Sequence, residues 1–267
     1  MLTHLSLFSG IGGLDLAAEA AGFTTVGQCE WADYPTKILE KHWPDVPRWR
    51  DIRTLTGESF YERTGLRTID VISGGFPCQP FSVAGERKGK EDDRYLWPEM
   101  LRVIQEIRPT WVLGENVPGI INLALDEVLS SLEGIGYDCA TFHIPACGVD
   151  APHKRFRIAI LAHTDDRSRI VRRDGKFPTA TETERKRKDH GGRTAANVTG
   201  ERRSVKPGLG GVADGLSYWM DEPDGIPRVT PVKKNRADRL KCLGNAVVPQ
   251  QFYPIFAAIA EIERRSE

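Results

Sequence analysis

The chain alternates short apolar runs with amphipathic stretches over its first 160 residues. Apolar runs of strand length lie at residues 4–8, 24–29, 69–73, 110–114, 137–144 and 156–162. The helical spacing of apolar positions predicts helices at residues 12–21, 34–42, 97–107 and 123–133. Strands that alternate with helices in this way indicate a doubly wound, mainly parallel α/β sheet with helices on both faces.

The pattern changes after residue 164. Residues 165–230 are rich in Arg, Lys, Gly, Thr and Pro and show little apolar periodicity, which favours a small separate lobe or a long functional insertion. Regular character returns at about residue 239. Residues 250–264 predict an amphipathic helix with one apolar side, formed by Phe252, Ile255, Phe256, Ile259 and Ile262. We therefore expect three parts, at residues 1–164, 165–235 and 236–267.

The charge is unevenly distributed, although the 267-residue chain has a formal net charge of zero. Residues 165–206 hold 9 Arg and 4 Lys against 4 Asp and 3 Glu, an excess of six positive charges. A basic face suits a phosphate backbone. A solvated surface loop would have the same composition, so charge alone leaves both interpretations open.

Composition also bears on compartment and on metal binding. The five cysteines are scattered and form no CxxC pair, so neither a zinc site nor a disulfide framework is expected. No apolar run approaches membrane-spanning length, and the first residues lack a signal-peptide pattern. We expect a reduced, cytoplasmic protein that does not associate with a membrane.

One cysteine lies between two prolines. The strand at residues 69–73 leads directly into residues 75–80, with the sequence GFPCQP. Because proline fixes its own φ and restricts the preceding residue, this loop holds Cys78 at a defined angle. Such rigidity favours a nucleophile that must meet one substrate atom, although a buried structural cysteine is the alternative.

A glycine turn and three later residues indicate a cofactor site. Residues 5–14 predict a strand, a glycine turn and the start of a helix. Because glycine has no side chain, such a turn lets a ligand approach the backbone closely. Glu30 follows Gly10 by twenty positions, and in dinucleotide-type folds an acid there holds ribose hydroxyls. Trp31 could stack on adenine, and Asp51 could accept a hydrogen bond from its amine. A surface acid, a core tryptophan and a turn cap are the alternatives for these three residues.

These segments occur in the order typical of one enzyme family. They are residues 8–13 (FSGIGG), 30–31 (EW), 51–52 (DI), 75–82 (GFPCQPFS), 115–117 (ENV), 155–157 (RFR) and 244–249 (GNAVVP). In them the chain resembles the cytosine-C5 DNA methyltransferases, in the compact form of phage, prophage or bacterial enzymes. The resemblance implies the Rossmann-like fold of S-adenosylmethionine-dependent methyltransferases, with a small, mostly irregular target-recognition lobe at residues 165–235.

The resemblance implies S-adenosylmethionine as the cofactor. Glu30 would hold the ribose, Trp31 and Ile52 would flank the adenine, and Asp51 would bind its amine. The implied cofactor-binding residues are Phe8, Gly10, Gly12, Gly13, Leu14, Glu30, Trp31, Asp51, Ile52, Pro77, Asn245 and Val247. The segment around Asn245 would return beside the first strand to close the pocket.

The resemblance also implies the catalytic residues. Cys78 would add to C6 of cytosine, and a protonated Glu115 would donate to N3. Arg157 would stabilise O2, while Arg155 would support Arg157 or contact Glu115 or phosphate. The target nucleotide must leave the duplex, and we expect the basic, glycine-punctuated residues 82–90 to close over the DNA.

Two departures from the family pattern affect the DNA contacts. His153 stands where the family usually has Gln, and the expected motif between residues 208 and 234 is not recognisable. We expect double-stranded DNA as partner and a monomer, and a companion restriction endonuclease stays open. Alternatives are a transfer-RNA methyltransferase, an inactive DNA-binding relative, and a thiol hydrolase with a His partner for Cys78.

Overall fold

The computed structural model of the protein describes residues 1–77, 95–151, 153–164 and 236–266. Three sequence-based predictions therefore lie outside the described residues: the nucleophile Cys78, residues 82–90 that were expected to close over the DNA, and the target-recognition region at residues 165–235. In the described ranges, no helix combines the length and the apolar character needed to cross a bilayer.

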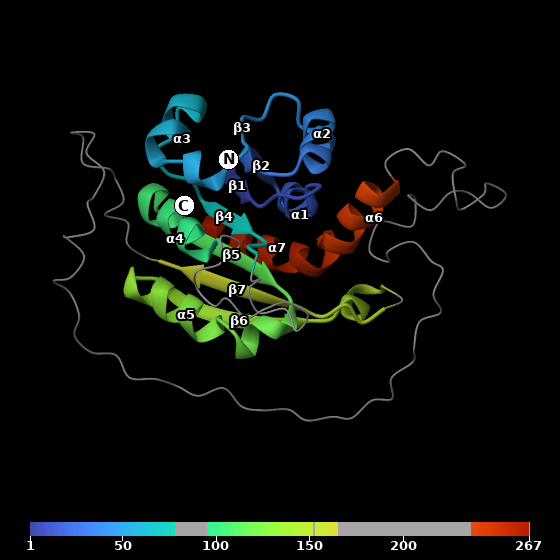
Figure 1. Ribbon diagram of the computed structural model, residues 1–267. Coiled ribbons are helices and arrows are strands. Elements are labelled where there is room, and N and C mark those ends of the chain that lie inside the picture. Colours follow the sequence, from blue (N-terminus) through green and yellow to red (C-terminus); the bar gives the residue numbers. More distant parts are fainter. Residues whose placement is uncertain (78–94, 152, 165–235, 267) are drawn as a thin grey trace.

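A seven-stranded sheet forms the centre of the protein (Figure 1). Its strands, in spatial order, are β3 (Arg48–Trp49), β2 (Phe23–Cys29), β1 (Leu2–Leu7), β4 (Val71–Gly74), β5 (Trp111–Asn116), β7 (Arg157–His163) and β6 (Asp138–Ile144). The first five are mutually parallel, and β7 pairs antiparallel with both β5 and β6. The predicted fold class, a mainly parallel doubly wound sheet, is confirmed.

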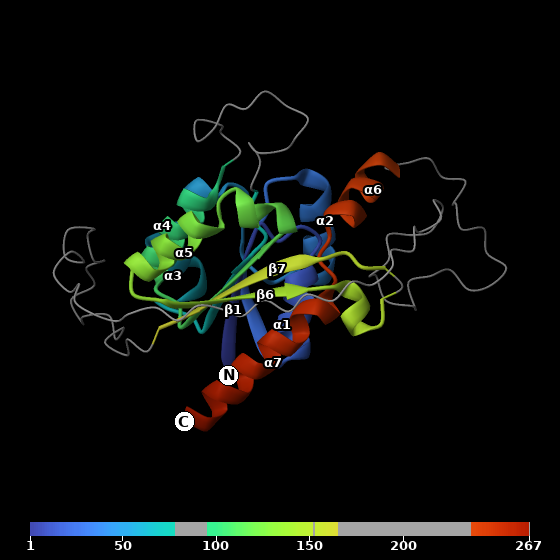
Figure 2. The same ribbon diagram turned by 90° about the horizontal axis from the view of Figure 1, so that it is seen from below.

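Helices cover both faces of the sheet. They are α1 (Gly13–Ala20), α2 (Asp33–His42), α3 (Gly57–Thr64), α4 (Trp97–Ile107), α5 (Leu125–Gly134), α6 (Arg236–Asn245) and α7 (Pro249–Ser266), with short 3-10 turns η1 (Ile52–Thr54), η3 (Pro118–Asn122) and η4 (Ala146–Val149). Figure 2 shows α3, α4 and α5 along one face and α1 and α7 along the other. Each face has its own apolar core.

The last helix returns to the first part of the chain. In α7, Phe252, Phe256 and Ile259 are buried against α1 and the sheet, as their spacing predicts. Ile262 was predicted on the same side but is 46 % exposed, because the end of α7 extends past the body of the protein (Figure 2). Residues far apart in sequence thus complete one core.

Three elements differ from the sequence-based prediction. The first strand ends at Leu7, since the backbone of Phe8 takes the left-handed conformation at φ 52°. Strand β3, which is only two residues long, lies outside the predicted strand ranges. Helix α3 was not predicted, although Thr56 and Ser59 form a reciprocal capping box at its start.

A buried polar layer lies between β1 and α1. The Asp15 carboxylate accepts from Ser6 Oγ at 2.9 Å and from Gln28 Nε2 at 2.8 Å. His4 Nε2 lies 2.7 Å from Ser73 Oγ. Burial raises the pKa of Asp15 to about 6 and lowers the pKa of His4 to about 3.

The strand order reverses at β1, which lies between β2 and β4. In open α/β sheets, ligands bind at such a switch point, beyond the carboxyl ends of the strands. Two of the predicted motifs follow these ends: the glycine turn comes after β1, and Gly75 to Pro77 come after β4. The topology therefore brings the two motifs together.

Candidate active site

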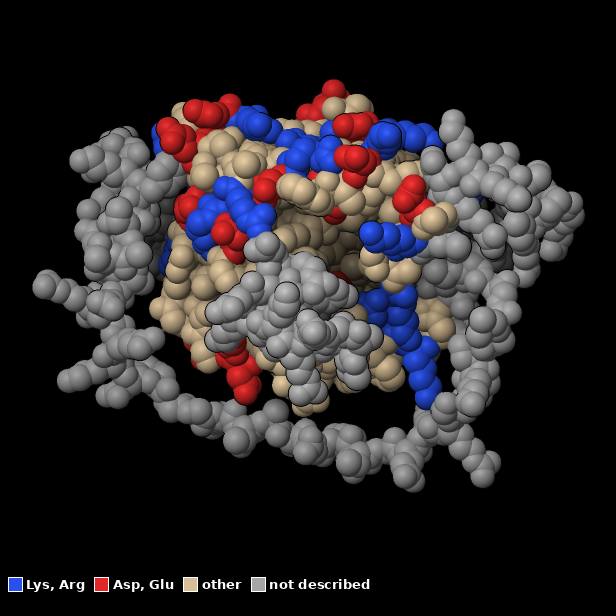
Figure 3. All heavy atoms as spheres, viewed as in Figure 1, with Lys and Arg blue, Asp and Glu red and all other residues tan. Residues whose placement is uncertain are grey.

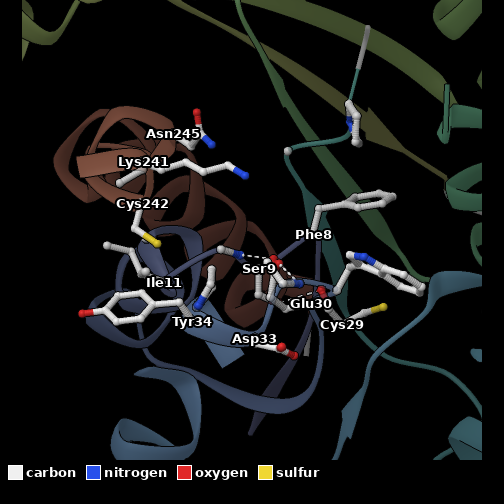
Figure 4. A pocket seen from close by; sticks show the side chains of 18 of the residues that line it. Phe8, Ser9, Ile11, Cys29, Glu30, Asp33, Tyr34, Lys241, Cys242 and Asn245 are labelled. Carbon is white, nitrogen blue, oxygen red and sulfur yellow. Dashed lines mark hydrogen bonds between the residues drawn. The ribbon is translucent and has the colours of Figure 1, made fainter. Parts of the chain in front are cut away.

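The turn after β1 is held by the side chain of Glu30. Phe8, Gly10 and Gly12 all have positive φ, at 52°, 56° and 89°, which turns the chain sharply into α1. Glu30 Oε2 accepts from the Gly10 N–H at 2.8 Å, and Oε1 accepts from the Ala32 N–H at 2.8 Å. Figure 4 shows this carboxylate beside the cavity. The end of β2 thereby fixes the shape of the glycine turn.

The ends of β2 and β3 supply an aromatic ring and a second acid. Trp31 is 70 % exposed, so its ring is available for stacking. Asp51 caps η1, where its side chain accepts from the Arg53 N–H at 3.0 Å, and Ile52 is buried beneath it. The capping role named as an alternative for Asp51 is thus present, and Asp51 also lines the cavity.

The segment after α6 closes the opposite side. Asn245 and Val247 line the cavity, and a Cβ on Gly13 would lie only 2.8 Å from the Val247 carbonyl oxygen. Gly13 therefore permits this segment to lie directly on the start of α1. Gly12, in contrast, faces the ring of Trp43, which its missing Cβ would approach to 2.5 Å, and it does not line the cavity.

One cavity of about 960 Å³ joins these groups. Figure 3 shows a hollow on this face, with charged side chains of both signs around it. Of the predicted cofactor-binding residues, all except Gly12 line the cavity: Phe8, Gly10, Gly13, Leu14, Glu30, Trp31, Asp51, Ile52, Pro77, Asn245 and Val247. Gly75 and Glu115 line it as well, so it extends from the glycine turn to the end of β5.

The end of β5 holds the loop that leads to Cys78. Asn116 Nδ2 donates to the Phe76 carbonyl oxygen at 3.0 Å, and both residues are buried. A Cβ on Gly75 would lie 2.7 Å from Glu115 Oε2. The ENV motif thus contacts the loop of the predicted nucleophile through two successive side chains.

Glu115 and Arg157 form an ion pair at the end of the cavity near Gly75. This end is called the base side, because the resemblance implies that Glu115 and Arg157 contact the cytosine base. Arg157 Nε lies 2.8 Å from Glu115 Oε1, with the two side chains 12 % and 11 % exposed. Burial raises the pKa of Glu115, and the positive charges of Arg157 and Arg155 oppose this shift only in part. A carboxyl group in this position is suited to hold a proton at a higher pH than an ordinary glutamate.

Arg155 has different partners from Arg157. Its Nη2 donates to the carbonyl oxygens of Gly244 and Ala246, both at 2.7 Å. The structure therefore brings Arg155 to the segment that closes the cavity. Neither Arg155 nor Arg157 lines the cavity itself.

Two described cysteines line the cavity, and neither is suited to be a nucleophile. Cys29 is buried at the end of β2, and burial raises its pKa to about 12. Burial also raises the pKa of Cys242. A reactive cysteine must form a thiolate, a condition that neither Cys29 nor Cys242 meets, and Cys78 stays a prediction.

Sequence reasoning missed several lining residues. Lys241 and Cys242 project from α6 toward the cavity, opposite Tyr34 at the start of α2 (Figure 4). No motif identifies them, because their place depends on where α6 lies. Among the described residues, no group of three or more His, Cys, Asp or Glu side chains could hold a metal ion.

The donor set fits an adenosine-bearing cofactor. The bare backbone of Gly10 opens on the cavity, Glu30 offers a carboxylate suited to ribose hydroxyls, and Trp31 offers an exposed ring. This combination of a glycine turn with an acid at the end of the second strand is the pattern of nucleoside recognition in such sheets.

Comparison with known proteins identifies the family. The model of the family described as C-5 cytosine-specific DNA methylase matches residues 2–205. The Type II methyltransferase M.AquIA of Picosynechococcus is 39 % identical over 132 residues, which are 48 % of this chain and 53 % of that protein. M.Eco47II of Escherichia coli is 36 % identical over 171 residues, 61 % of this chain and 40 % of that protein. The chain thus spans between two fifths and about half the length of these relatives.

Solved structures agree with the sequence comparison. A DNA modification methyltransferase encoded within an E. coli prophage matches with a TM-score of 0.53 and 28 % identity, over 61 % of this chain and 47 % of that one. Dnmt2 of S. pombe matches in fold with a TM-score of 0.53 at 24 % identity, over 67 % of this chain and 59 % of that one. The predicted resemblance is confirmed: the chain belongs to the C-5 cytosine-specific DNA methylase family.

Proposed function

We propose that this protein transfers a methyl group from S-adenosylmethionine to C5 of a cytosine in duplex DNA. Family membership implies S-adenosylmethionine as the methyl donor, as the sequence predicted. The observation that supports the reaction best is the contact of Glu115 and Asn116 with residues 75–77, beside the same cavity as the glycine turn. An acid with a raised pKa, the loop that leads to the proposed nucleophile and the proposed cofactor pocket would thus share one site.

Different residues of the cavity would hold different parts of the cofactor. Glu30 would bind the ribose hydroxyls, Trp31 and Ile52 would enclose the adenine, and Asp51 would accept from its amine. The glycine turn and Asn245 would hold the amino acid end. When bound, S-adenosylmethionine supplies an electrophilic methyl group.

Cys78 would make the cytosine reactive. Its thiolate adds to C6, so that an S–C6 bond forms, the ring loses its aromaticity and C5 becomes nucleophilic. After methylation, a base takes the C5 proton, and the electrons of the C5–H bond form the C5–C6 double bond as the S–C6 bond breaks, which restores the ring and the thiolate.

Glu115 and Arg157 would assist this addition. A protonated Glu115 donates to N3 as C6 is attacked, which draws charge away from the ring. Arg157 is held by Glu115 and would stabilise the charge that develops on O2. Since protonated Glu115 is required, kcat should fall as pH rises through its raised pKa.

A cytosine within a duplex cannot reach these groups, so it must be flipped out. We propose residues 82–90 for closure over the DNA and residues 165–235 for reading the recognition sequence. The basic composition of residues 165–206 supports contact with phosphates.

Transfer of tritiated methyl groups tests the reaction. The purified protein, given S-adenosylmethionine, should label mixed-sequence duplex DNA and not transfer RNA, and Cys78→Ser should abolish the labelling. Glu115→Gln should lower kcat by about 10²- to 10⁴-fold and remove the alkaline decline of kcat. Labelling of transfer RNA alone, or full activity in Cys78→Ser, would reject the proposal. A duplex with 5-fluorocytosine at the target site should trap the Cys78 adduct, since the C5 proton is then missing.

A further inference from the structure

We propose that Arg155 is a positioning residue for the cofactor pocket, and that Gln251 acts with it to hold the closing segment, residues 244–247. The proposal rests on the proposed function, since it takes the cavity to be the cofactor site. It gives Arg155 a role apart from the base-side ion pair of Glu115 and Arg157.

The guanidinium of Arg155 holds the closing segment directly. A single nitrogen, Nη2, donates to the carbonyl oxygens of Gly244 and Ala246, each at 2.7 Å. These carbonyls flank Asn245, which lines the cavity. Hydrogen bonds from a charged donor are stronger than those between neutral groups, so this contact fixes the backbone on both sides of Asn245.

Gln251 holds the main chain of Arg155, at the other end of that residue from its guanidinium. Its Nε2 donates to the Arg155 carbonyl oxygen at 3.0 Å and to the Ile144 carbonyl oxygen at 2.9 Å, and the residue is only 1 % exposed. The backbone of Arg155 has φ 22°, a conformation that side-chain-bearing residues rarely adopt. A strained residue of this kind persists only where its surroundings hold it, and here a buried amide does so.

The closing segment also has a fixed wall on its other side. The Val247 carbonyl oxygen lies against Gly13 at the start of α1, where any Cβ would approach it to 2.8 Å. Residues 244–247 are therefore held between the glycine turn and Arg155. Loss of the Arg155 contact would free this segment on the side away from Gly13.

Substitutions at both positions test this clamp, by which we mean the hydrogen bonds of Arg155 and Gln251 that hold residues 244–247. Arg155→Met and Gln251→Met remove the donors at similar side-chain length, and Arg155→Lys keeps a charged donor with several N–H groups. Arg67→Met is the matched control, because Arg67 is also half-buried but lies over the ring of Tyr61, at 4.0 Å, and does not line the cavity. Titration calorimetry with S-adenosylhomocysteine measures the cofactor site without DNA.

We expect Arg155→Met and Gln251→Met to weaken S-adenosylhomocysteine binding by about 10- to 100-fold, as expected for loss of hydrogen bonds to a charged group or to a buried amide. The affinity of Arg155→Lys for S-adenosylhomocysteine should stay within about threefold of the parent's affinity. The affinity of Arg67→Met should equal that of the parent. In methyl transfer, KM for S-adenosylmethionine should rise while kcat at saturating cofactor changes little.

Parental affinity for S-adenosylhomocysteine in Arg155→Met would overturn the inference. A large loss of kcat in that same variant would then assign Arg155 to the site of Glu115 and Arg157. Thermal unfolding of each variant identifies a loss of fold, and if Arg155→Met does not fold, Gln251→Met alone decides by the same criteria. A parent that binds S-adenosylhomocysteine but transfers no methyl group would reject the proposed function and leave the clamp testable.

Discussion

At the scale of single residues, the base side of the site depends on an absent side chain. Gly75 lies so close to Glu115 that a Cβ would stand 2.7 Å from Oε2. Real Cβ atoms do not approach a carboxylate oxygen this closely, so any other residue at position 75 must displace Glu115. Glu115 and the loop at residues 75–77 are therefore fitted to one another.

This contact predicts the effect of Gly75→Ala. We expect kcat to fall by about tenfold or more, because a small displacement of an acid or base has large effects on catalysis. Binding of S-adenosylhomocysteine should change little, since Glu30, Trp31 and Asp51, proposed to hold the adenosine, follow other strands. Gly119→Ala in η3 is the control, as its Cβ would meet nothing closer than Leu123 at 3.8 Å. Equal kcat in the two variants would contradict the prediction.

The residues predicted to bind the cofactor all line one cavity except Gly12, and the reason is physical. Glu30 and Asp51 follow strands whose carboxyl ends meet at one edge, so order along the chain is enough to bring them together. Gln251 and Lys241 had no such signal. Gln251 binds main-chain carbonyls, which every residue possesses, and Lys241 depends on the position of α6.

At the scale of elements, η1 is fixed by a helix on the neighbouring face. Arg102 in α4 donates to the carbonyl oxygens of Ile52 at 2.9 Å and Leu55 at 3.1 Å. Ion pairs with Glu99 and Glu106, at 2.9 and 2.8 Å, orient the guanidinium. Helix α4 thus holds the turn that presents Asp51 and Ile52 to the cavity.

We expect Arg102→Met to weaken binding of S-adenosylhomocysteine by about tenfold, because the carbonyls of Ile52 in η1 and of Leu55 at its end lose a charged donor. Glu99→Gln leaves those two contacts in place, so its affinity for S-adenosylhomocysteine should lie within about twofold of the parent's affinity. Calorimetric titration of both variants provides the comparison. Identical affinities would mean that η1 keeps its shape without Arg102.

Local sequence determined the elements to different degrees. Helix α4 has the predicted limits, since Pro98 starts it and Pro109 follows its end. Helix α3 escaped prediction because it buries only Gly57 and Phe60, too few for a periodic signal, and only its capping box marks it. The end of the first strand depends on the left-handed backbone of Phe8, for which the apolar run at residues 4–8 gives no signal.

At the scale of the whole molecule, two buried groups make stability depend on pH in opposite directions. The raised pKa of Asp15, about 6 against 3.8, means that the folded state binds more protons, so Asp15 destabilises the fold as pH rises from about 4 to 6. The lowered pKa of His4, about 3 against 6.5, means that the unfolded state binds more protons, so His4 destabilises the fold as pH falls through the same range. The two effects oppose each other between about pH 4 and 6.

Substitutions should separate the contributions of Asp15 and His4 to the pH dependence of the free energy of unfolding. In Asp15→Asn, the free energy of unfolding should rise with pH more steeply than in the parent between about pH 4 and 6, by up to about 1.4 kcal/mol per unit. In His4→Gln it should rise less steeply or fall, by a similar amount. Urea unfolding at several pH values measures both, and each variant serves as the control for the other. Parallel curves for the parent and both variants would exclude this opposition.

The continuity of the cavity has a consequence for ligand design. No wall of described residues divides the part near Trp31 and Glu30 from the part near Glu115 and Gly75, since all four line the same space. One compound that links a nucleoside to a pyrimidine could therefore occupy both halves at once. Such a tethered inhibitor would gain from the effective concentration of its second group, and it would compete with donor and acceptor alike.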